Sequence, residues 1–167
     1  MPRAKNDKAF EALINDYGGL IHRIASTYER RPELIDELVQ DTALAIWRAL
    51  DHFRKEASVK SYIARITHNV CISHVRKAAV RPETPLEDIY ADKAPQPDEI
   101  TGKMIMRQKL LSAVHQLGLP ERQIISLYLE GFTQKESAEI LGLTPSNIGV
   151  KLTRIRAKLK DLMDTQS

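Results

Sequence analysis

The 167-residue sequence has little cysteine, few aromatic residues and no long apolar run. Its single cysteine, Cys71, cannot form a disulfide within the chain or a cysteine-based zinc site, so we expect a buried, unreactive thiol. No stretch approaches the roughly 20 apolar residues that a membrane-spanning helix needs. The charged beginning of the chain does not resemble a signal peptide. We therefore expect a soluble, cytoplasmic protein without membrane insertion.

The sequence also lacks the alternation of apolar and polar residues that is typical of strands, which predicts an all-α fold. An apolar content of 43% can bury one modest core or two small ones, and two fit better. Periodicity predicts a helix over residues 7–28 that bends or breaks at Gly18 and Gly19. A second helix follows Pro32, and a third runs from the N-cap Ser58 to about residue 79.

Acidic residues are absent from one segment and concentrated in the next. No acid lies between Ala57 and Pro82, whereas six acids and three bases lie between Ala79 and Lys103. The second segment contains four prolines and no sustained apolar stripe. We therefore predict two small helical domains, residues 1–79 and 104–167, joined by a Pro/acid-rich linker over residues 80–103. The net charge of +3 hides two basic blocks, which suggest two contacts with one polyanion.

Motifs of catalysis and metal binding are missing. The sequence has no glycine-rich phosphate loop and no G-x-S-x-G elbow. Its five histidines show no metal-ligand spacing; His68 and His74, for example, fall on different faces of a helix. We therefore expect neither an enzyme nor a protein that needs a metal or another cofactor.

Residues 133–160 predict a pair of capped helices joined by a short turn. Thr133 and Glu136 have the spacing of a capping box, in which each side chain bonds the other residue's backbone amide. Gly142 can end the first helix in the left-handed conformation, and Thr144 followed by Pro145 can begin the second. This pattern predicts a DNA-reading helix-turn-helix.

The second helix of this pair has one apolar and one basic side. Apolar residues recur at helical spacing at Ile148, Leu152, Ile155, Leu159 and Leu162. The exposed flank carries Asn147, Lys151, Arg154 and Lys158. An amide near the N-terminal end can read base edges, and the cations can bind phosphates. A merely solvated basic face is the alternative, which the caps and the short turn disfavour.

The third helix combines an aromatic residue with cations. The spacing places Val59, Ile63, Ile66 and Val70 on a buried arc. Arg65, His68, Asn69 and Arg76 share the opposite arc, with Tyr62 at its edge. Such a surface suits an unpaired base stacked on the aromatic ring and held through its phosphates. A solvated polar face with Tyr62 half-buried stays open as the alternative.

The second helix is expected to bury Ile35, Leu38, Val39, Thr42, Ile46, Leu50 and Phe53. Its polar residues Glu37, Gln40 and Asp41, together with Leu44, lie away from this stripe. Paired carboxylates can serve acid/base chemistry, but no histidine or cleft motif accompanies them. A solvated face explains them adequately without further information.

Three motifs in this order resemble the bacterial RNA polymerase sigma factors of the extracytoplasmic-function (ECF) group, in the sigma-70 family. The segment IDELVQDTALAIWRALDHF resembles their polymerase-binding region, and SYIARITHNVCISHVRK resembles the helix that reads and melts the minus-10 element. The segment from Leu119 to Leu159 resembles their minus-35-reading domain. The likeness covers nearly the whole chain.

The resemblance implies a non-enzymatic specificity subunit whose partners are core RNA polymerase and promoter DNA. It implies minus-35 contacts by Ser146, Asn147, Lys151, Arg154, Arg156 and Lys158. It implies minus-10 contacts by Tyr62, Arg65, His68, Asn69, Arg76 and Lys77. It implies polymerase contacts by Glu37, Leu38, Gln40 and Asp41. It also adds an anti-sigma factor as a candidate partner.

Gly149 stands within the minus-35-reading helix, where glycine costs about 1 kcal/mol relative to alanine. The glycine either allows the backbone to approach DNA closely, or it lowers the stability of the helix without any compensating benefit.

Two other functions remain alternatives from the sequence. One is a helix-turn-helix regulator that does not act as a polymerase subunit, and it predicts a stable dimer on a palindromic operator. The other is a helical interaction module whose basic faces bind an acidic protein partner.

Overall fold

The computed structural model describes residues 2–53, 58–80 and 102–165, with side chains from residue 7 onward. Every regular element in these residues is helical, which confirms the all-α prediction. The elements are α1 (Pro2–Tyr28), α2 (Pro32–Ala49), the 3-10 helix η1 (Leu50–His52), α3 (Val59–Val80), α5 (Gly102–His115), α6 (Leu119–Leu129), α7 (Gln134–Leu141) and α8 (Pro145–Thr165). Most of the predicted linker lies outside the described residues, and its two ends, Val80 and residues 102–103, belong to helices.

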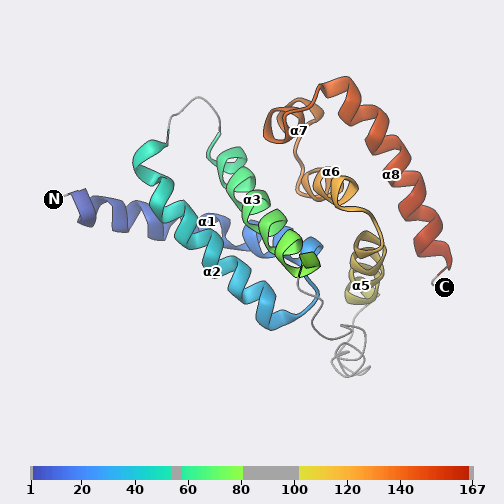
Figure 1. Ribbon diagram of the computed structural model, residues 1–167, viewed down its shortest axis with the longest axis horizontal. Coiled ribbons are helices and arrows are strands. Elements are labelled where there is room, and N and C mark those ends of the chain that lie inside the picture. The colour runs from blue at the N-terminus through green and yellow to red at the C-terminus, as the bar shows by residue number, and fades with distance from the viewer. Residues whose placement is uncertain (1, 54–57, 81–101, 166–167) are drawn as a thin grey trace.

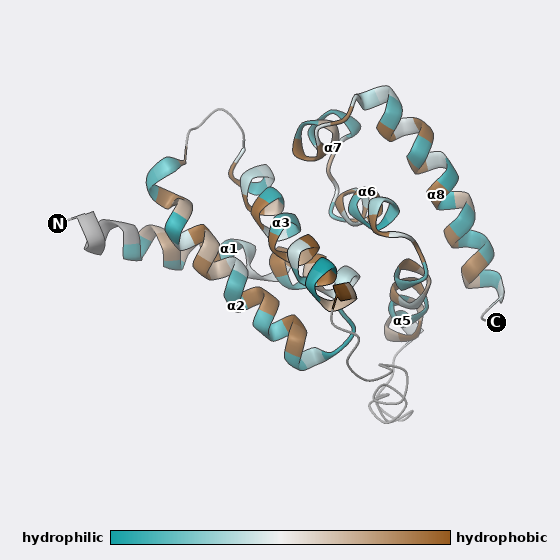
Figure 2. Cartoon of the chain, in the orientation of Figure 1, coloured by the Kyte–Doolittle hydropathy of each residue, from teal (hydrophilic) through white to brown (hydrophobic). Residues whose placement is uncertain are grey.

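The first half of the molecule consists of α1, α2 and α3, which pack against one another on the left of Figure 1. The helix α1 runs through Gly18 and Gly19 without interruption, so the break allowed for at this point does not occur. The hydroxyl of Ser58 accepts a hydrogen bond from the Ser61 amide at 3.1 Å, which confirms its role at the start of α3. Both α2 and α3 carry apolar as well as polar residues along their length (Figure 2).

The second half consists of α5 to α8, with α8 along its outer edge (Figure 1). The capping box of α7 is formed as predicted, by Thr133 and Glu136. Gly142 ends α7 with a φ of 70°, in the left-handed region that favours glycine. Ile148, Leu152, Ile155 and Leu159 of α8 are buried as their spacing predicts.

The buried apolar residues form two clusters. One lies within the second half, between α8 and the helices α5, α6 and α7. The other fills the space between α1, α2 and α3, but it also contains Leu127 of α6 and Phe132 of the turn before α7. The prediction of two small cores is therefore incomplete, because the first core extends into the second half of the chain.

Candidate nucleic-acid and protein-binding surfaces

The outer side of α8 is open to solvent. The Thr144 hydroxyl accepts a hydrogen bond from the backbone N–H of Asn147 at 3.2 Å, so α8 begins with the predicted cap. All six residues to which the sequence assigns minus-35 contacts are exposed: Ser146, Asn147, Lys151, Arg154, Arg156 and Lys158. Val150, an apolar residue in the same stretch, is 54% exposed. A row of polar and cationic groups therefore faces away from the core.

Two of these cations also contact α6. Lys158 Nζ lies 3.3 Å from Glu121 Oε1, and the Arg156 guanidinium lies 5.3 Å from the centroid of the Tyr128 ring. Lys151 and Arg154 instead line a shallow groove between α8 and α6, floored by Ile124 and Ile155 and edged by Pro120 and Glu121. The N-terminal half of α8 is thus more available to a ligand than the part around Arg156.

The predicted minus-10 surface of α3 is only partly assembled as expected. Arg65, Asn69, Arg76 and Lys77 are exposed. Tyr62 is half-buried, donates a hydrogen bond to the Ala49 carbonyl at 3.3 Å, and packs its ring 4.8 Å from that of Phe53. The aromatic ring is therefore anchored against Phe53 and the end of α2 and stays partly exposed.

His68 does not belong to this surface, so the prediction that it shares the exposed arc is wrong. Its side chain is 2% exposed, its Nδ1 shares a hydrogen bond with the Tyr28 hydroxyl at 2.5 Å, and its Nε2 lies 3.4 Å from the Ser126 hydroxyl. Burial lowers the pKa of His68 to about 4, which keeps the ring neutral, and burial also raises the pKa of Tyr28. The second half of the molecule covers the histidine through Ser126.

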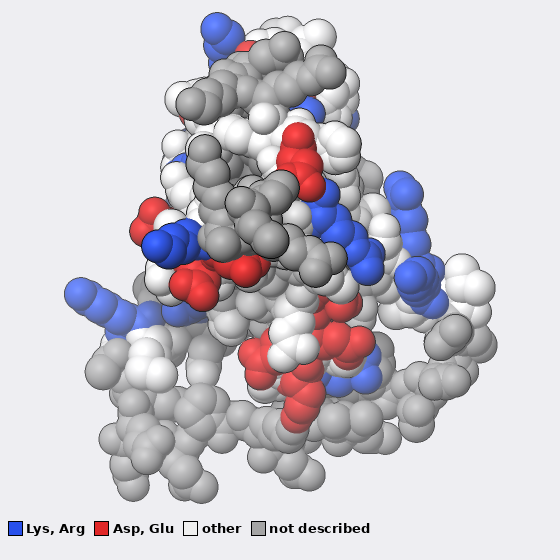
Figure 3. All heavy atoms as spheres, turned by 90° about the vertical axis from the view of Figure 1, so that its left-hand side faces the viewer, with Lys and Arg blue, Asp and Glu red and all other residues white. Residues whose placement is uncertain are grey.

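The exposed side of α2 carries Glu37, Gln40, Asp41 and the 47% exposed Leu44. Glu37 and Asp41 line a groove shared with Asn69, Ser73, His74 and Lys77 of α3, which Leu38 and Val70 floor. Leu38 is only 2% exposed and belongs to the first core, so it reaches this surface only as part of the floor of the groove. On the side of the molecule where α2 and the outer end of α1 lie, carboxylates and cations are interspersed (Figure 3).

The two halves meet along a contact that we call the seam, formed by α1 and α3 on one side and α5, α6 and α7 on the other. Arg23 forms an ion pair with Glu130: its Nε donates to Oε1 at 2.9 Å and to Oε2 at 3.0 Å, and its Nη2 lies 2.9 Å from Oε1. Lys60 donates to the Glu130 carbonyl at 2.8 Å and lies 4.7 Å from the centroid of the Phe132 ring. The Arg65 guanidinium donates to the Glu139 carbonyl at 2.8 Å. Two cations of α3 thus bind the second half.

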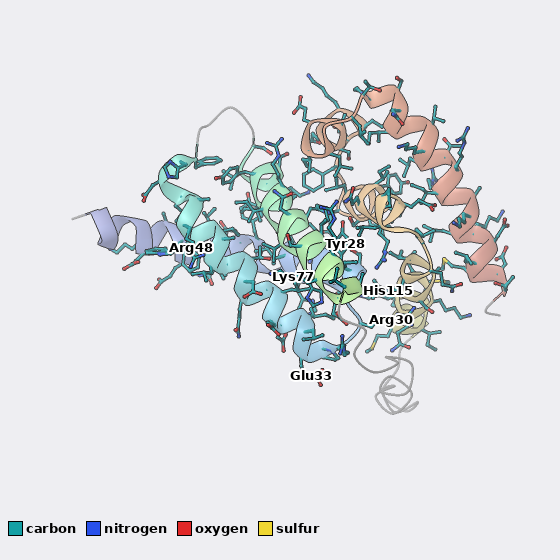
Figure 4. The ribbon with its side chains drawn as sticks, viewed as in Figure 1. Tyr28, Arg30, Glu33, Arg48, Lys77 and His115 are labelled. Atoms are coloured by element: carbon teal, nitrogen blue, oxygen red, sulfur yellow. The ribbon has the colours of Figure 1, made fainter. Side chains whose placement is uncertain are left out.

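A second polar cluster lies where the last turn of α5 packs against the end of α1. The His115 Nε2–H donates to the Ser26 carbonyl at 2.8 Å. Burial, followed by the charge of Arg30, lowers the pKa of His115 to about 4. Figure 4 shows Tyr28, Arg30 and His115 gathered between the two halves. The buried His68 and the partly buried His115 are therefore neutral groups at the seam.

The same end of α1 carries a buried carboxylate. Glu29 accepts hydrogen bonds from the backbone amides of Arg30 and Arg31, each at 3.0 Å, and lies 2.8 Å from His74 Nε2. Burial raises the pKa of Glu29, but these hydrogen bonds outweigh it and hold the pKa below its usual value. Glu29 thus fixes the turn between α1 and α2 and links it to α3.

Both halves of the chain match known families. Residues 13–81 match Sigma-70 region 2, and residues 107–159 match Sigma-70, region 4. The ECF RNA polymerase sigma factor SigM of Mycobacterium tuberculosis is 29% identical over 157 residues, covering 93% of this chain and 77% of SigM. The chain belongs to the sigma-70 family, in its ECF group. It is a sigma factor that directs promoter recognition and transcription initiation by RNA polymerase.

Other relatives of this chain are also named as sigma factors. The RNA polymerase sigma factor CnrH of Cupriavidus metallidurans is 27% identical over 172 residues, covering 97% of this chain and 90% of CnrH. The solved structure of CnrH with the cytosolic domain of CnrY has a TM-score of 0.72 and 24% identity, covering 96% of this chain and 91% of that one. RpoE of Bartonella quintana, solved with the anti-sigma factor NepR, has a TM-score of 0.74 and 22% identity, covering 96% of this chain and 99% of that one. These structural likenesses establish the shared fold.

Sequence reasoning missed the residues of the seam. Arg23, Lys60 and Glu130 had no assigned role, although each makes a contact between the halves. Periodicity within one helix cannot identify such pairs, because Arg23 and Glu130 are 107 positions apart. The excess of cations on α3 was the available signal, and its interpretation as a purely DNA-directed surface was too narrow.

The described residues contain no cluster of three or more His, Cys, Asp or Glu side chains that could hold a metal ion. None of the helices within residues 2–53, 58–80 and 102–165 is long and apolar enough to cross a membrane.

Proposed function

We propose that this sigma factor divides its work among three helices. The exposed side of α2 binds core RNA polymerase, α3 contacts the minus-10 element, and α8 reads the minus-35 element. The observation that carries the proposal is that each helix buries one apolar side in a core and presents a polar side to solvent. Catalysis belongs to the polymerase, so the sigma factor itself has no catalytic activity and works in the cytoplasm with the polymerase.

For the minus-35 element, α8 enters the major groove by its N-terminal half. Ser146 and Asn147 in the first turn contact base edges, and Lys151 and Arg154 contact phosphates further along. This order is supported by the exposure of all four side chains and by the groove that Lys151 and Arg154 line. Arg156 and Lys158 belong to the same surface and add charge from the side that faces α6.

For the minus-10 element, the contacting residues on α3 are Asn69, Arg76 and Lys77, with Arg65 and the exposed part of Tyr62. His68 is left out because its side chain is buried. The Arg65 Nη2 donates to the Glu139 carbonyl, so this part of the guanidinium becomes available to DNA only when α7 moves away from α3. Full engagement of Arg65 by the promoter therefore includes a separation of the two halves along this part of the seam.

For core polymerase, the contacting residues on α2 are Glu37, Gln40 and Asp41. All three are exposed, and the two carboxylates edge the groove between α2 and α3. Leu38 supports this surface from the core beneath it. A partner with cationic side chains suits such an edge, because acidic and basic groups steer one another during association.

An anti-sigma factor is a further partner that we propose for this chain. The solved relatives that support it are CnrH, described in complex with the cytosolic domain of CnrY, and RpoE, described in complex with the anti-sigma factor NepR. Such a partner would act on the sigma factor by competing for the surfaces of α2, α3 and α8.

The proposal is tested by reconstitution with purified core polymerase. The wild-type protein should support initiation at a promoter selected from a random library, while the free protein binds the same DNA weakly. Arg154→Ala should weaken use of the minus-35 element about tenfold and leave polymerase affinity intact, because removing one phosphate or base contact costs about 1–3 kcal/mol. Lys160→Ala, on the same helix and outside the assigned set, is the matched control.

Asp41→Lys should have the opposite effect: it should weaken polymerase binding and leave the DNA-contacting residues of α8 unchanged. Asp36→Lys makes the same charge change on the same helix, at another exposed position, and serves as its control. Equal losses of polymerase binding and minus-35 use in both Asp41→Lys and Arg154→Ala would contradict the division of labour. Failure of the wild-type protein to direct initiation would contradict the proposed function as a whole.

A further inference from the structure

Gly149 of α8 lies against the side chain of a residue on the neighbouring helix. A Cβ at Gly149 would lie 3.0 Å from Oε1 and 3.4 Å from Nε2 of Gln134, the first residue of α7. A contact of 3.0 Å is tighter than ordinary van der Waals packing, so an alanine here would push the Gln134 amide aside. The glycine thus leaves room for that amide directly beside the N-terminal half of α8.

The position of Gly149 around the helix decides which side the amide occupies. Successive residues of an α-helix are separated by about 100°, so Gly149 lies on one flank of the buried Ile148, and Lys151 lies on the other. The Gln134 side chain therefore lines the flank of α8 that faces α7, and the cationic stripe lines the flank that faces α6. The two flanks border the same exposed face, which contains Ser146 and Val150.

The Gln134 amide has free hydrogen-bonding capacity. Its side chain is exposed, and it makes no hydrogen bond to the part of the chain that the structure describes. The neighbouring cap does not need it, because Thr133 and Glu136 satisfy each other's backbone amides. A primary amide offers two N–H donors, so this group can bind an anionic oxygen.

The geometry of a helix-turn-helix on DNA gives this amide a ligand. When the second helix lies in the major groove, the first helix crosses the sugar-phosphate backbone at the groove's edge. Glutamine is among the side chains that donate to phosphate oxygens in such complexes. We propose that Gln134 donates a hydrogen bond to a phosphate of the minus-35 element and that Gly149 positions it there. This inference rests on the proposed function.

The proposal also replaces the sequence-based interpretation of Gly149. A close approach of DNA to the backbone of α8 at this point would need the space next to Gly149 to be empty. That space holds the Gln134 amide instead. The glycine is therefore a positioning residue, and the group that touches the ligand belongs to α7.

The first test is Gln134→Ala in the reconstituted holoenzyme, with binding measured on a selected promoter and on single-base variants of its minus-35 element. We expect binding to weaken about fivefold to tenfold on every variant alike, as for the loss of one hydrogen bond to a charged group at a wet surface. Its salt dependence should not change, because a neutral amide displaces no counterion. Arg154→Ala should reduce the salt slope by about one and provides the contrast.

The second test separates positioning from helix stability. Gly149→Ala should raise the thermal stability of the protein, since alanine is the better helix former, and yet weaken promoter binding about threefold to fivefold by displacing Gln134. Gly18→Ala is the matched control, because a Cβ at Gly18 of α1 would meet nothing within 4 Å. It should raise stability without any effect on promoter binding.

A double-mutant cycle joins the two tests. In the Gln134→Ala background, Gly149→Ala should cause no further loss, because no side chain remains to be displaced. Additive losses would overturn the role of Gly149, and a loss confined to one base pair would overturn the phosphate contact. Unchanged binding by Gln134→Ala, with a wild-type protein that initiates normally, would overturn the inference alone. A wild-type protein that fails to initiate would overturn the proposed function as well.

Discussion

The helices α3 and α8 are both rich in cations, but their cations have different surroundings. The polar residues of the first half of α8 face solvent, and the nearest protein groups belong to the same half of the molecule. On α3, Lys60 and Arg65 donate to backbone carbonyls of the other half. The difference indicates that α8 is ready for DNA as it stands, whereas the N-terminal part of α3 must first be released from the seam.

The largest effect on stability is expected from removing an apolar side chain at the seam. Leu127 of α6 is 0% exposed and belongs to the core of the first half. Leu127→Ala should lower the free energy of unfolding by about 2–5 kcal/mol, because it leaves a cavity where the two halves meet. Urea unfolding measures the loss. Leu129→Ala, at a 41% exposed position of the same helix, should cost far less. Equal costs would mean that the halves do not share a core in solution.

Acidification should weaken the seam through its buried histidines. The pKa of His68 is about 4 in the folded protein and about 6.5 in the unfolded chain, so only the unfolded chain binds the proton between these values. Stability is then full above pH 6.5 and falls towards pH 4, by at most about 1.4 kcal/mol per pH unit for this residue. Urea unfolding at several pH values checks the slope.

His68→Gln removes this contribution and should flatten the dependence, although it lowers stability at neutral pH by disturbing the contacts with Tyr28 and Ser126. His22→Gln makes the same substitution at an exposed position of α1 and controls for the change of residue type. A variant lacking His68 with the wild-type slope would contradict its burial as a neutral group.

The smallest expected effect concerns the ion pair at the rim of the seam. Arg23 is 52% exposed although Glu130 is only 11% exposed, so solvent screens the pair from one side and Glu130→Gln should cost about 1 kcal/mol. The loss should shrink further at high salt. Glu139→Gln is the control, because the recorded contact of Glu139 with Arg65 uses its backbone carbonyl. A loss above 2 kcal/mol, measured by urea unfolding, would mean that this pair holds the halves together more strongly than its exposure suggests.

The features that the sequence predicts correctly depend on residues near one another in the chain. The capping box at Thr133, the glycine at position 142 and the apolar period of α8 are all local patterns, and the structure confirms them. Local chemistry decides these features because helix ends and helix faces are satisfied within a few residues.

The features that the sequence does not predict depend on the contact between the halves. His68 lies between Tyr28 of α1 and Ser126 of α6, so residues of both halves bury it. The burial of Leu38, by contrast, follows from the apolar period of α2, and only the family motif groups this residue with its exposed neighbours. The position of Gln134 against Gly149 also needs the angle between two helices, which no spacing within either helix supplies.

The burial of Cys71 turns the lone thiol of this chain into an internal probe. Its side chain is 0% exposed, and burial raises the pKa of the thiol to about 12, so almost none of it is the reactive thiolate at neutral pH. An alkylating reagent can reach it only during transient opening of the first half. The rate of labelling at this single position therefore measures how often α1, α2 and α3 come apart, without any engineered reporter.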